Sequence, residues 1–177
     1  MEQTQLKRLI IEKNKGETIV AINGKIERWQ EALLLSWVVM WTALGVYVFL
    51  QLFGDYPRDN KLTFFVYLVF WAYFEFRGVH ALLWRLFGQE LIKITDSEIL
   101  YKRDIKSYGK AIRFQRENVK NVRLNEANTK SFASVYHKSF WIVKGGDVLF
   151  DYLGKTIALG VQLEEKDARK LMKALRG

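Results

Sequence analysis

Two long apolar blocks separate polar segments along the chain, and their pattern predicts a helical hairpin. Residues 32–53 contain no charged side chain, and as a helix they would extend about 33 Å, enough to cross a hydrocarbon layer about 30 Å thick. Residues 62–87 begin equally apolar. Their second half carries the ionisable side chains Glu75, Arg77, His80 and Arg85. Since residues 54–61 combine Gly, Pro, Asp and Asn as a turn does, the two helices are expected to be antiparallel neighbours.

The second block is longer than one crossing requires, so its last turns are expected to emerge into the headgroup layer. A cleaved signal peptide is disfavoured because a polar segment of about thirty residues precedes the first block and a second apolar block follows. The remaining alternative is a hairpin buried in the core of a soluble protein. A charge-free run of this length with charged flanks favours the membrane.

The distribution of Lys and Arg around the two blocks predicts the orientation of the hairpin. The turn contains only Arg58 and Lys61, next to two aspartates. The flanking segments are richer in cationic residues, namely Lys7, Arg8, Lys13, Lys15, Lys25, Arg28, Lys93, Lys102, Arg103, Lys106 and Lys110. Both termini are therefore expected in the cytoplasm. Candidate aromatic anchors at the membrane surface, for which ordinary packing is the alternative, are Trp29, Trp37, Tyr56 and Trp84.

The polar remainder alternates between short apolar runs and turns, a pattern typical of β-strands. After residue 88 about seven short strands are predicted, which suggests a curled sheet or a small β-barrel. The predicted runs are 91–94, 98–103, 111–115, 119–124, 140–143, 148–152 and 156–159. Residues 6–26 contain two more candidate strands, and these are expected to dock on the C-terminal sheet because both segments lie on one side of the membrane.

An apolar stripe at helical spacing predicts a final helix, and its members are Leu163, Ala168, Leu171, Met172 and Leu175. Acidic residues occupy its first turns and basic residues its last, as the helix dipole favours. The helix is interpreted as a lid on the open end of the barrel, with a partner-binding surface as the alternative. The predicted fold class is membrane α + β, with N-terminal strands at 1–30, a transmembrane hairpin at 31–88 and a β-rich domain at 89–177.

Several stretches of this sequence carry a resemblance to a known family. They are residues 81–90 (ALLWRLFGQE), 149–156, 159–160 and 163–165. Together with the preceding hairpin and the final helix, they resemble small bacterial membrane proteins with a cytoplasmic pleckstrin-homology-like (PH-like) domain. The resemblance covers about residues 20–177 and implies a PH-like β-barrel or curled sheet capped by a C-terminal helix. It implies no active site, because its motifs are structural.

Composition and charge narrow the functional classes. A net charge of +9 predicts a polyanionic neighbour, and a membrane tether disfavours nucleic acid relative to anionic lipids or an acidic protein. The chain contains no Cys and only two His, so thiolate chemistry is excluded and a metal site is disfavoured. Residues 128–137 contain two Ser and one His but no nucleophile-elbow motif, and Gly145 and Gly146 indicate a hairpin turn. No enzyme, cofactor or metal site is predicted.

The ionisable residues of the second block form the first candidate site, because a charge within a membrane span is a functional candidate by default. Glu75 and Arg77 point to different faces of a helix, whereas Arg77 and His80 can share one. Contact with another membrane subunit, anchoring at the membrane edge and a proton or ion path remain alternatives, although two helices alone cannot enclose a path. The residues expected to contact a partner are Glu75, Arg77, His80, Trp37, Trp41 and Trp71. Gly45 can let the two helices approach closely.

A basic stretch after the second block forms the second candidate site. The residues expected to contact anionic lipid headgroups are Lys102, Arg103, Lys106, Lys110 and Arg113. The stretch continues with Arg116, Lys120 and Arg123. An ordinary solvated face of the sheet is the alternative interpretation.

Two functional hypotheses follow. The first is a non-enzymatic accessory or assembly subunit of a larger bacterial inner-membrane complex, which contacts other integral membrane proteins through its helices and its PH-like domain. The second is a membrane-anchored module that binds or senses anionic lipids through the basic stretch.

Overall fold

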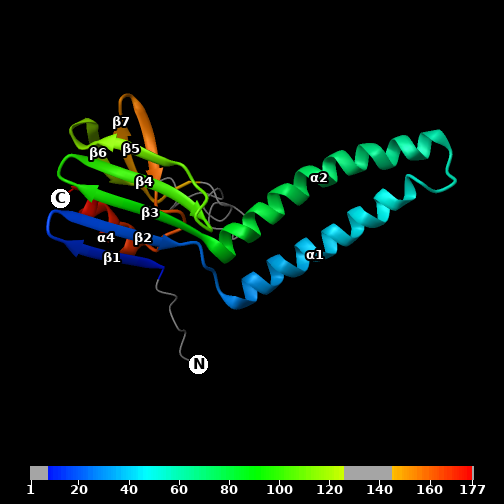
Figure 1. Cartoon of the computed structure of the whole chain (residues 1–177), viewed down its shortest axis with the longest axis horizontal. Helices are drawn as coiled ribbons and strands as arrows, with labels where there is room; N and C mark the ends of the chain where they lie inside the picture. Colours follow the sequence, from blue (N-terminus) through cyan, green and yellow to red (C-terminus); the bar gives the residue numbers. More distant parts are fainter. Residues whose placement is uncertain (1–7, 126–144, 177) are drawn as a thin grey trace. The chain divides into compact units, whose positions relative to one another are not determined.

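A computed structural model describes residues 8–125 and 145–176 and separates the chain into two compact units. The hairpin unit comprises Glu27–Leu83, and the β unit combines Met1–Ile26 with Trp84–Gly177. The chain therefore leaves the β unit after its N-terminal strands and returns to it for the rest of its length. Its elements make a mixed α+β protein (Figure 1).

Two long helices form the hairpin unit, as predicted. Helix α1 spans Arg28–Gln51, and α2 spans Arg58–Phe87, so its last turn belongs to the β unit. Both helices are long and apolar enough to cross a membrane. Many of their large apolar side chains are exposed, among them Met40, Tyr47 and Phe76. A core helix of a soluble protein would bury such side chains, so their exposure argues against the soluble-core alternative.

Glycine and tryptophan residues bring α1 and α2 into close contact. Gly45 lies against the indole of Trp71, where a Cβ at residue 45 would overlap the ring. The Trp71 indole N–H donates to the carbonyl oxygen of Trp41 at 2.9 Å, and the Trp41 indole donates back to the Trp71 carbonyl at 3.4 Å. The close approach predicted at Gly45 is confirmed.

Five strands form the larger sheet of the β unit, and the chain order equals the spatial order. They are β1 (Leu9–Asn14), β2 (Glu17–Asn23), β3 (Gly88–Thr95), β4 (Glu98–Ile105) and β5 (Ala111–Gln115), all antiparallel to their neighbours. Strands β2 and β3 pair along their whole length, from Glu17↔Thr95 to Asn23↔Gln89. The prediction that the N-terminal strands join the later ones is confirmed.

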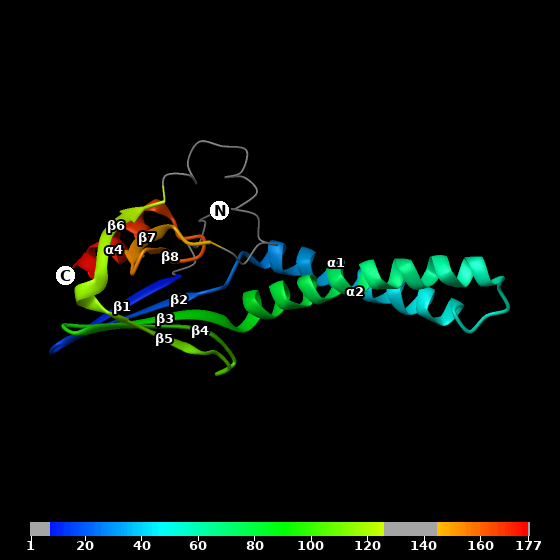
Figure 2. The same cartoon turned by 90° about the horizontal axis from the view of Figure 1, so that it is seen from above.

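A smaller sheet and a helix complete the β unit. Strands β6 (Val119–Leu124), β7 (Val148–Tyr152) and β8 (Lys155–Leu159) form an antiparallel three-stranded sheet, and α4 spans Glu165–Arg176. Figure 2 shows this sheet and α4 on the same face of the five-stranded sheet. Residues 128–137 and the predicted strand at 140–143 lie outside the described residues.

The predicted curled sheet or β-barrel is wrong for the described strands, which make two separate sheets. The short 3₁₀ helix Arg116–Asn118 lies between β5 and β6, and these two strands belong to different sheets. Alternation of apolar and polar residues identifies the face that each strand buries, but it does not specify how the strand edges pair. The number of predicted strands therefore does not determine whether their sheet closes.

One apolar core fills the space between the two sheets and α4. The five-stranded sheet contributes Val20, Ile22, Ile92 and Ile99, and the smaller sheet contributes residues such as Phe150. The buried members of the predicted helical stripe, which also belong to this core, are Ala168, Leu171 and Leu175. Helix α4 therefore covers a core, as the lid interpretation expects, although that core lies between sheets and not within a barrel.

Gly45→Ala is expected to destabilise the helical hairpin by about 1–3 kcal/mol, because the added methyl group displaces the Trp71 ring from its packed position. The free energy of unfolding of the full chain in mixed detergent micelles measures the effect. Ala43→Val is the matched control, since Ala43 is exposed on the same helix and should tolerate added methyl groups. Equal stability of the two variants would contradict the close packing at Gly45.

Candidate functional site

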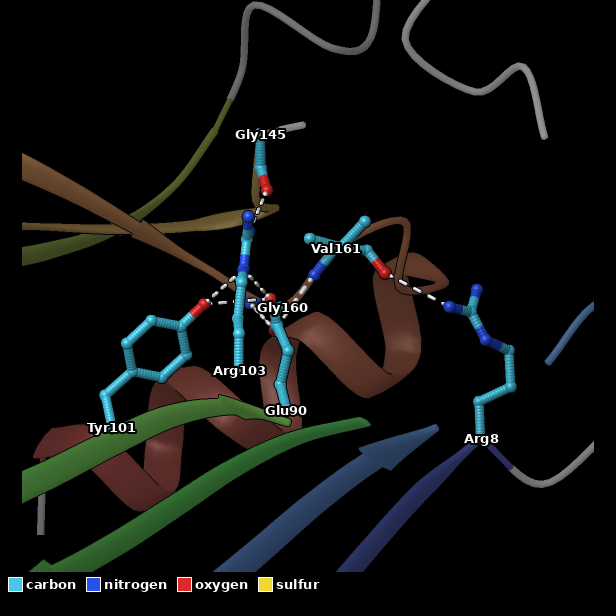
Figure 3. A network of polar contacts seen from close by, with 7 residues as sticks. All are labelled: Arg8, Glu90, Tyr101, Arg103, Gly145, Gly160 and Val161. Carbon is cyan, nitrogen blue, oxygen red and sulfur yellow. Dashed lines mark hydrogen bonds and ion pairs between the residues drawn. The ribbon is translucent and has the colours of Figure 1, made fainter. Parts of the chain in front are cut away.

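A buried carboxylate, Glu90, is the centre of the polar network in the β unit. Glu90 lies on β3 directly opposite Arg103 on β4, and its side chain is inaccessible to solvent. One carboxylate oxygen accepts hydrogen bonds from the Tyr101 hydroxyl at 2.9 Å and the Arg103 Nε at 3.0 Å. The other accepts from the backbone N–H groups of Gly160 at 2.9 Å and Val161 at 3.2 Å. Figure 3 shows these donors around the carboxylate.

The network ties the five-stranded sheet to the turn that links β8 to α4. This turn, residues 160–162, includes Gly160 and Gln162 at positive φ angles of 76° and 53°. Arg8 donates to the carbonyl oxygens of Val161 and Gln162, and Arg85 donates to the Gln162 side chain at 2.7 Å. Side chains from the N-terminal end and from the middle of the chain thus converge on these three residues.

Two glycines make the start of β3 compact. The Gly24 N–H donates to the Gly88 carbonyl oxygen at 2.8 Å, and a Cβ on either glycine would overlap the Trp84 carbonyl oxygen. The Gly24 carbonyl oxygen in turn accepts from the Arg85 guanidinium at 3.3 Å. Arg85 is almost fully buried, with an exposed fraction of 1%. Arg85 therefore has a structural role within the β unit that the sequence did not indicate.

Burial and the neighbouring carboxylate determine the acid–base behaviour of the network. Burial raises the pKa of the Tyr101 phenol far above its usual value, and the negative charge of Glu90 adds to this shift. Burial also lowers the pKa of Arg8, an effect that the nearby acids Glu90 and Asp147 partly offset. The network is most stable with a neutral Tyr101 phenol and a charged Arg103 guanidinium, which bind the same oxygen of the carboxylate.

The chemistry open to this network is structural. The four donors to Glu90 occupy about all the lone pairs that a carboxylate offers, so it lacks the free acceptor position of a general base. Among residues 8–125 and 145–176, no group of three or more acidic or histidine side chains is placed to hold a metal ion. The hydrogen bonds to Glu90 fix the turn at residues 160–162 relative to the five-stranded sheet.

Three of the five residues predicted to contact anionic lipid have acidic partners within the domain. Arg103 pairs with Glu90 at 3.0 Å, Lys102 with Asp104 at 2.9 Å, and Arg113 with Glu98 at 3.1 Å. The other two predicted lipid contacts, which are exposed and make no ion pair with any described acid, are Lys106 and Lys110. The structure thus divides the predicted basic surface into three cations that pair with acids and two that have no ion-pair partner among the described acids.

The residues predicted to contact a membrane partner fall into two groups. Trp37, Trp41 and Trp71 are half-buried, and Trp37 and Trp41 stack with centroids 5.5 Å apart. Glu75 faces α1, where it accepts a hydrogen bond from the Thr42 hydroxyl at 2.7 Å. These four lie in the contact between α1 and α2. The remaining pair is exposed and consists of Arg77 and His80, with the imidazole of His80 stacked on Phe76.

Sequence reasoning missed Glu90, Arg8 and Arg85 as network residues. A signal for Glu90 was available, because Glu90, Ile92 and Ile94 recur with period two and lie on the same face of β3. The same period places Arg103 beside Tyr101 and Ile99 on β4. A carboxylate and a guanidinium at core-facing positions of consecutive strands indicate a buried ion pair.

Comparison of the chain with protein-family models, curated proteins and solved structures finds no match. The structure by itself defines the class of protein. It is a mixed α+β protein in which two membrane-length helices are inserted between the second and third strands of an antiparallel sheet.

Glu90→Gln is expected to lower the free energy of unfolding of the β unit by about 3 kcal/mol or more, because it removes a buried charge from Arg103 and turns an amide donor toward other N–H donors. Thermal unfolding of the full chain, followed by tryptophan fluorescence, measures the loss. Glu98→Gln is the matched control, since its partner Arg113 is 69% exposed, and it should cost less than about 1 kcal/mol. Equal losses would refute the central role of Glu90.

Tyr101 is expected to make the β unit sensitive to alkaline pH. Its pKa is raised in the folded state, so its contribution to stability is complete below the unfolded pKa of about 10 and is lost as the pH rises above it, by at most about 1.4 kcal/mol per unit. Tyr101→Phe should reduce the loss of stability between about pH 10 and 12. Tyr108→Phe, at a position 85% exposed, should leave the pH dependence unchanged. Parallel curves for wild type and Tyr101→Phe would contradict the assignment.

Proposed function

We propose that this chain is a non-enzymatic accessory or assembly subunit of a larger membrane complex, anchored by α1 and α2 in the inner membrane of a bacterium. The exposure of large apolar side chains on both helices is the observation that carries the proposal. Hydrocarbon or a partner helix is the environment in which such side chains are stable. The concentration of Lys and Arg outside the turn supports cytoplasmic termini.

Polar groups in the hairpin support contact with other membrane subunits. The second carboxylate oxygen of Glu75 is buried without a hydrogen-bond partner among the described residues, as is the Tyr67 hydroxyl. Both atoms are already covered within this chain, so the polar groups open to a neighbouring subunit are the exposed ones. Arg77 and His80 offer exposed donors on the same helix.

The β unit is proposed as the cytoplasmic docking module of the subunit. Two antiparallel sheets followed by one C-terminal helix support the PH-like assignment, without the closed barrel. The filled acceptor positions of Glu90 favour a scaffold over a catalyst. The second hypothesis, lipid binding through the whole basic stretch, has less support because Lys102, Arg103 and Arg113 pair with acids.

Extraction of native membranes in mild detergent is expected to recover the chain in an assembly of high mass, measured by native electrophoresis and mass spectrometry. The double variant Arg77→Gln and His80→Gln should shift the chain toward its free form, because it removes exposed donors from α2. Arg58→Gln, at the beginning of the same helix, is the control and should leave the assembly intact. Migration of the wild-type chain only as a monomer or homodimer would reject the proposed function.

A further inference from the structure

The turn between β4 and β5, residues 105–110, has an unfavourable backbone conformation. Lys106 and Ser107 both have positive φ angles, 50° and 72°, and the N–H and carbonyl groups of Ile105 and Tyr108 bond to each other. Hairpin turns of this kind favour Asn and Gly at the two central positions. Strained backbone at non-glycine residues is enriched at functional sites. This turn is therefore a candidate for a functional contact.

The turn presents two cationic residues and an aromatic residue to its surroundings. Lys106 and Lys110 are exposed and have no ion-pair partner among the described acids. Tyr108 is 85% exposed, the largest exposed fraction among the large hydrophobic side chains of the described chain. Nearby Ile112 on β5 is 48% exposed. Exposed lysine and tyrosine side chains next to an exposed aliphatic residue are suited to the interface between water and an anionic membrane.

The turn lies beside the last residue of α2. Ile105 pairs with Gly88 across β3 and β4, and Gly88 follows α2 directly. The Lys106 ammonium group lies 3.9 Å from the centre of the Phe87 ring. Lys102 donates to the Ser107 carbonyl oxygen at 3.2 Å and holds the turn in this position. Any membrane that α2 crosses is therefore close to this turn.

Contacts within the hairpin define the depth at which α2 would leave the membrane. The helices face each other at three pairs, Trp37 with Gly78, Thr42 with Glu75, and Gly45 with Trp71. Continuing this register places residue 32, the start of the first apolar block, level with residue 83. Phe87 then lies about 6 Å beyond the hydrocarbon boundary, inside a headgroup layer that adds about 5–7 Å on each side.

We infer that residues 105–110 form a membrane-surface anchor, in which Tyr108 enters the headgroup layer and Lys106 and Lys110 bind anionic lipid headgroups. The inference rests on the proposed crossing of the membrane by α2. It assigns lipid contact to one turn and not to the whole basic stretch, because this turn combines unpaired cations with proximity to the end of α2. The anchor holds the end of the five-stranded sheet at the membrane.

The absence of cysteine from the chain allows a single spin label to test the anchor. Ser107→Cys places a label in the turn, and Ser97→Cys, in the turn at the other end of β4, is the matched control. The full chain is placed in nanodiscs of phosphatidylcholine alone or with about 30% phosphatidylglycerol, and the ratio of collisions with oxygen to collisions with a water-soluble nickel chelate is measured. A label at Val46, exposed on α1, reports whether the helix is in lipid.

The label at residue 107 is expected to show a ratio at least about threefold higher than that at residue 97 in anionic nanodiscs, and the difference should shrink in phosphatidylcholine and at high salt. Lys106→Glu with Lys110→Glu should abolish it. Tyr108→Cys provides a second labelling position if the label at residue 107 disturbs the turn. Purified nanodiscs contain no partner protein, so immersion reports lipid contact alone.

Each outcome separates this inference from the proposed function. A lipid-exposed label at residue 46 together with water-exposed labels at residues 107 and 108 overturns the anchor and leaves the membrane crossing intact. A water-exposed label at residue 46 rejects the membrane crossing itself. Equal immersion of the turn in neutral and anionic nanodiscs overturns the binding of anionic headgroups by the two lysines.

Discussion

The buried Glu90 carboxylate is the interaction on which the arrangement of the β unit depends. An ionised carboxylate removed from water is unfavourable unless charge and hydrogen bonds replace the lost hydration. Arg103 supplies the charge, and Tyr101, Gly160 and Val161 complete the hydrogen bonds. Because the donors come from β4 and from the turn before α4, Glu90 is satisfied only when the five-stranded sheet, the turn and the helix are assembled. The carboxylate therefore penalises partial structures more than an apolar residue would, which favours one arrangement over alternative packings of similar apolar content.

Contacts next to this network explain how the five-stranded sheet can tolerate a long insertion. Strands β2 and β3 are antiparallel neighbours, and Asn23 pairs with Gln89, so the chain leaves the sheet and returns to it at adjacent points. In an ordinary hairpin a turn of a few residues would join them. Here the two helices take the place of that turn, and the β unit must define its own geometry at the point of insertion. The hydrogen bond from Gly24 to Gly88 and the buried Arg85 do so with short, directional contacts.

Local patterns in the sequence predicted the elements well, and long-range pairing poorly. Long apolar runs located α1 and α2, and alternation of apolar and polar residues located the described strands, because burial of one face repeats along a strand. The predicted barrel failed because a strand edge has no comparable signal, and Arg116–Asn118 separates strands that alternation alone would place in one sheet. The number of charged residues likewise could not distinguish the cations that pair with an acid from those that do not. Lys102 and Lys106 are both lysines of a basic stretch, but Lys102 pairs with Asp104 two residues along the same strand, whereas Lys106 lies in the turn that follows, against the Phe87 ring.

The two units distribute polarity in opposite ways. In the β unit apolar side chains such as Phe150 and Leu171 are inaccessible and most cations face outward, as water requires. In the hairpin Thr42 and Glu75 bond to each other between the helices, whereas Tyr47 and Phe76 are exposed. One solvent cannot favour both arrangements, because exposed apolar area is unfavourable in water and exposed polar groups are unfavourable in hydrocarbon. The two distributions are those that the proposed membrane crossing requires, with the hairpin in hydrocarbon and the β unit in water.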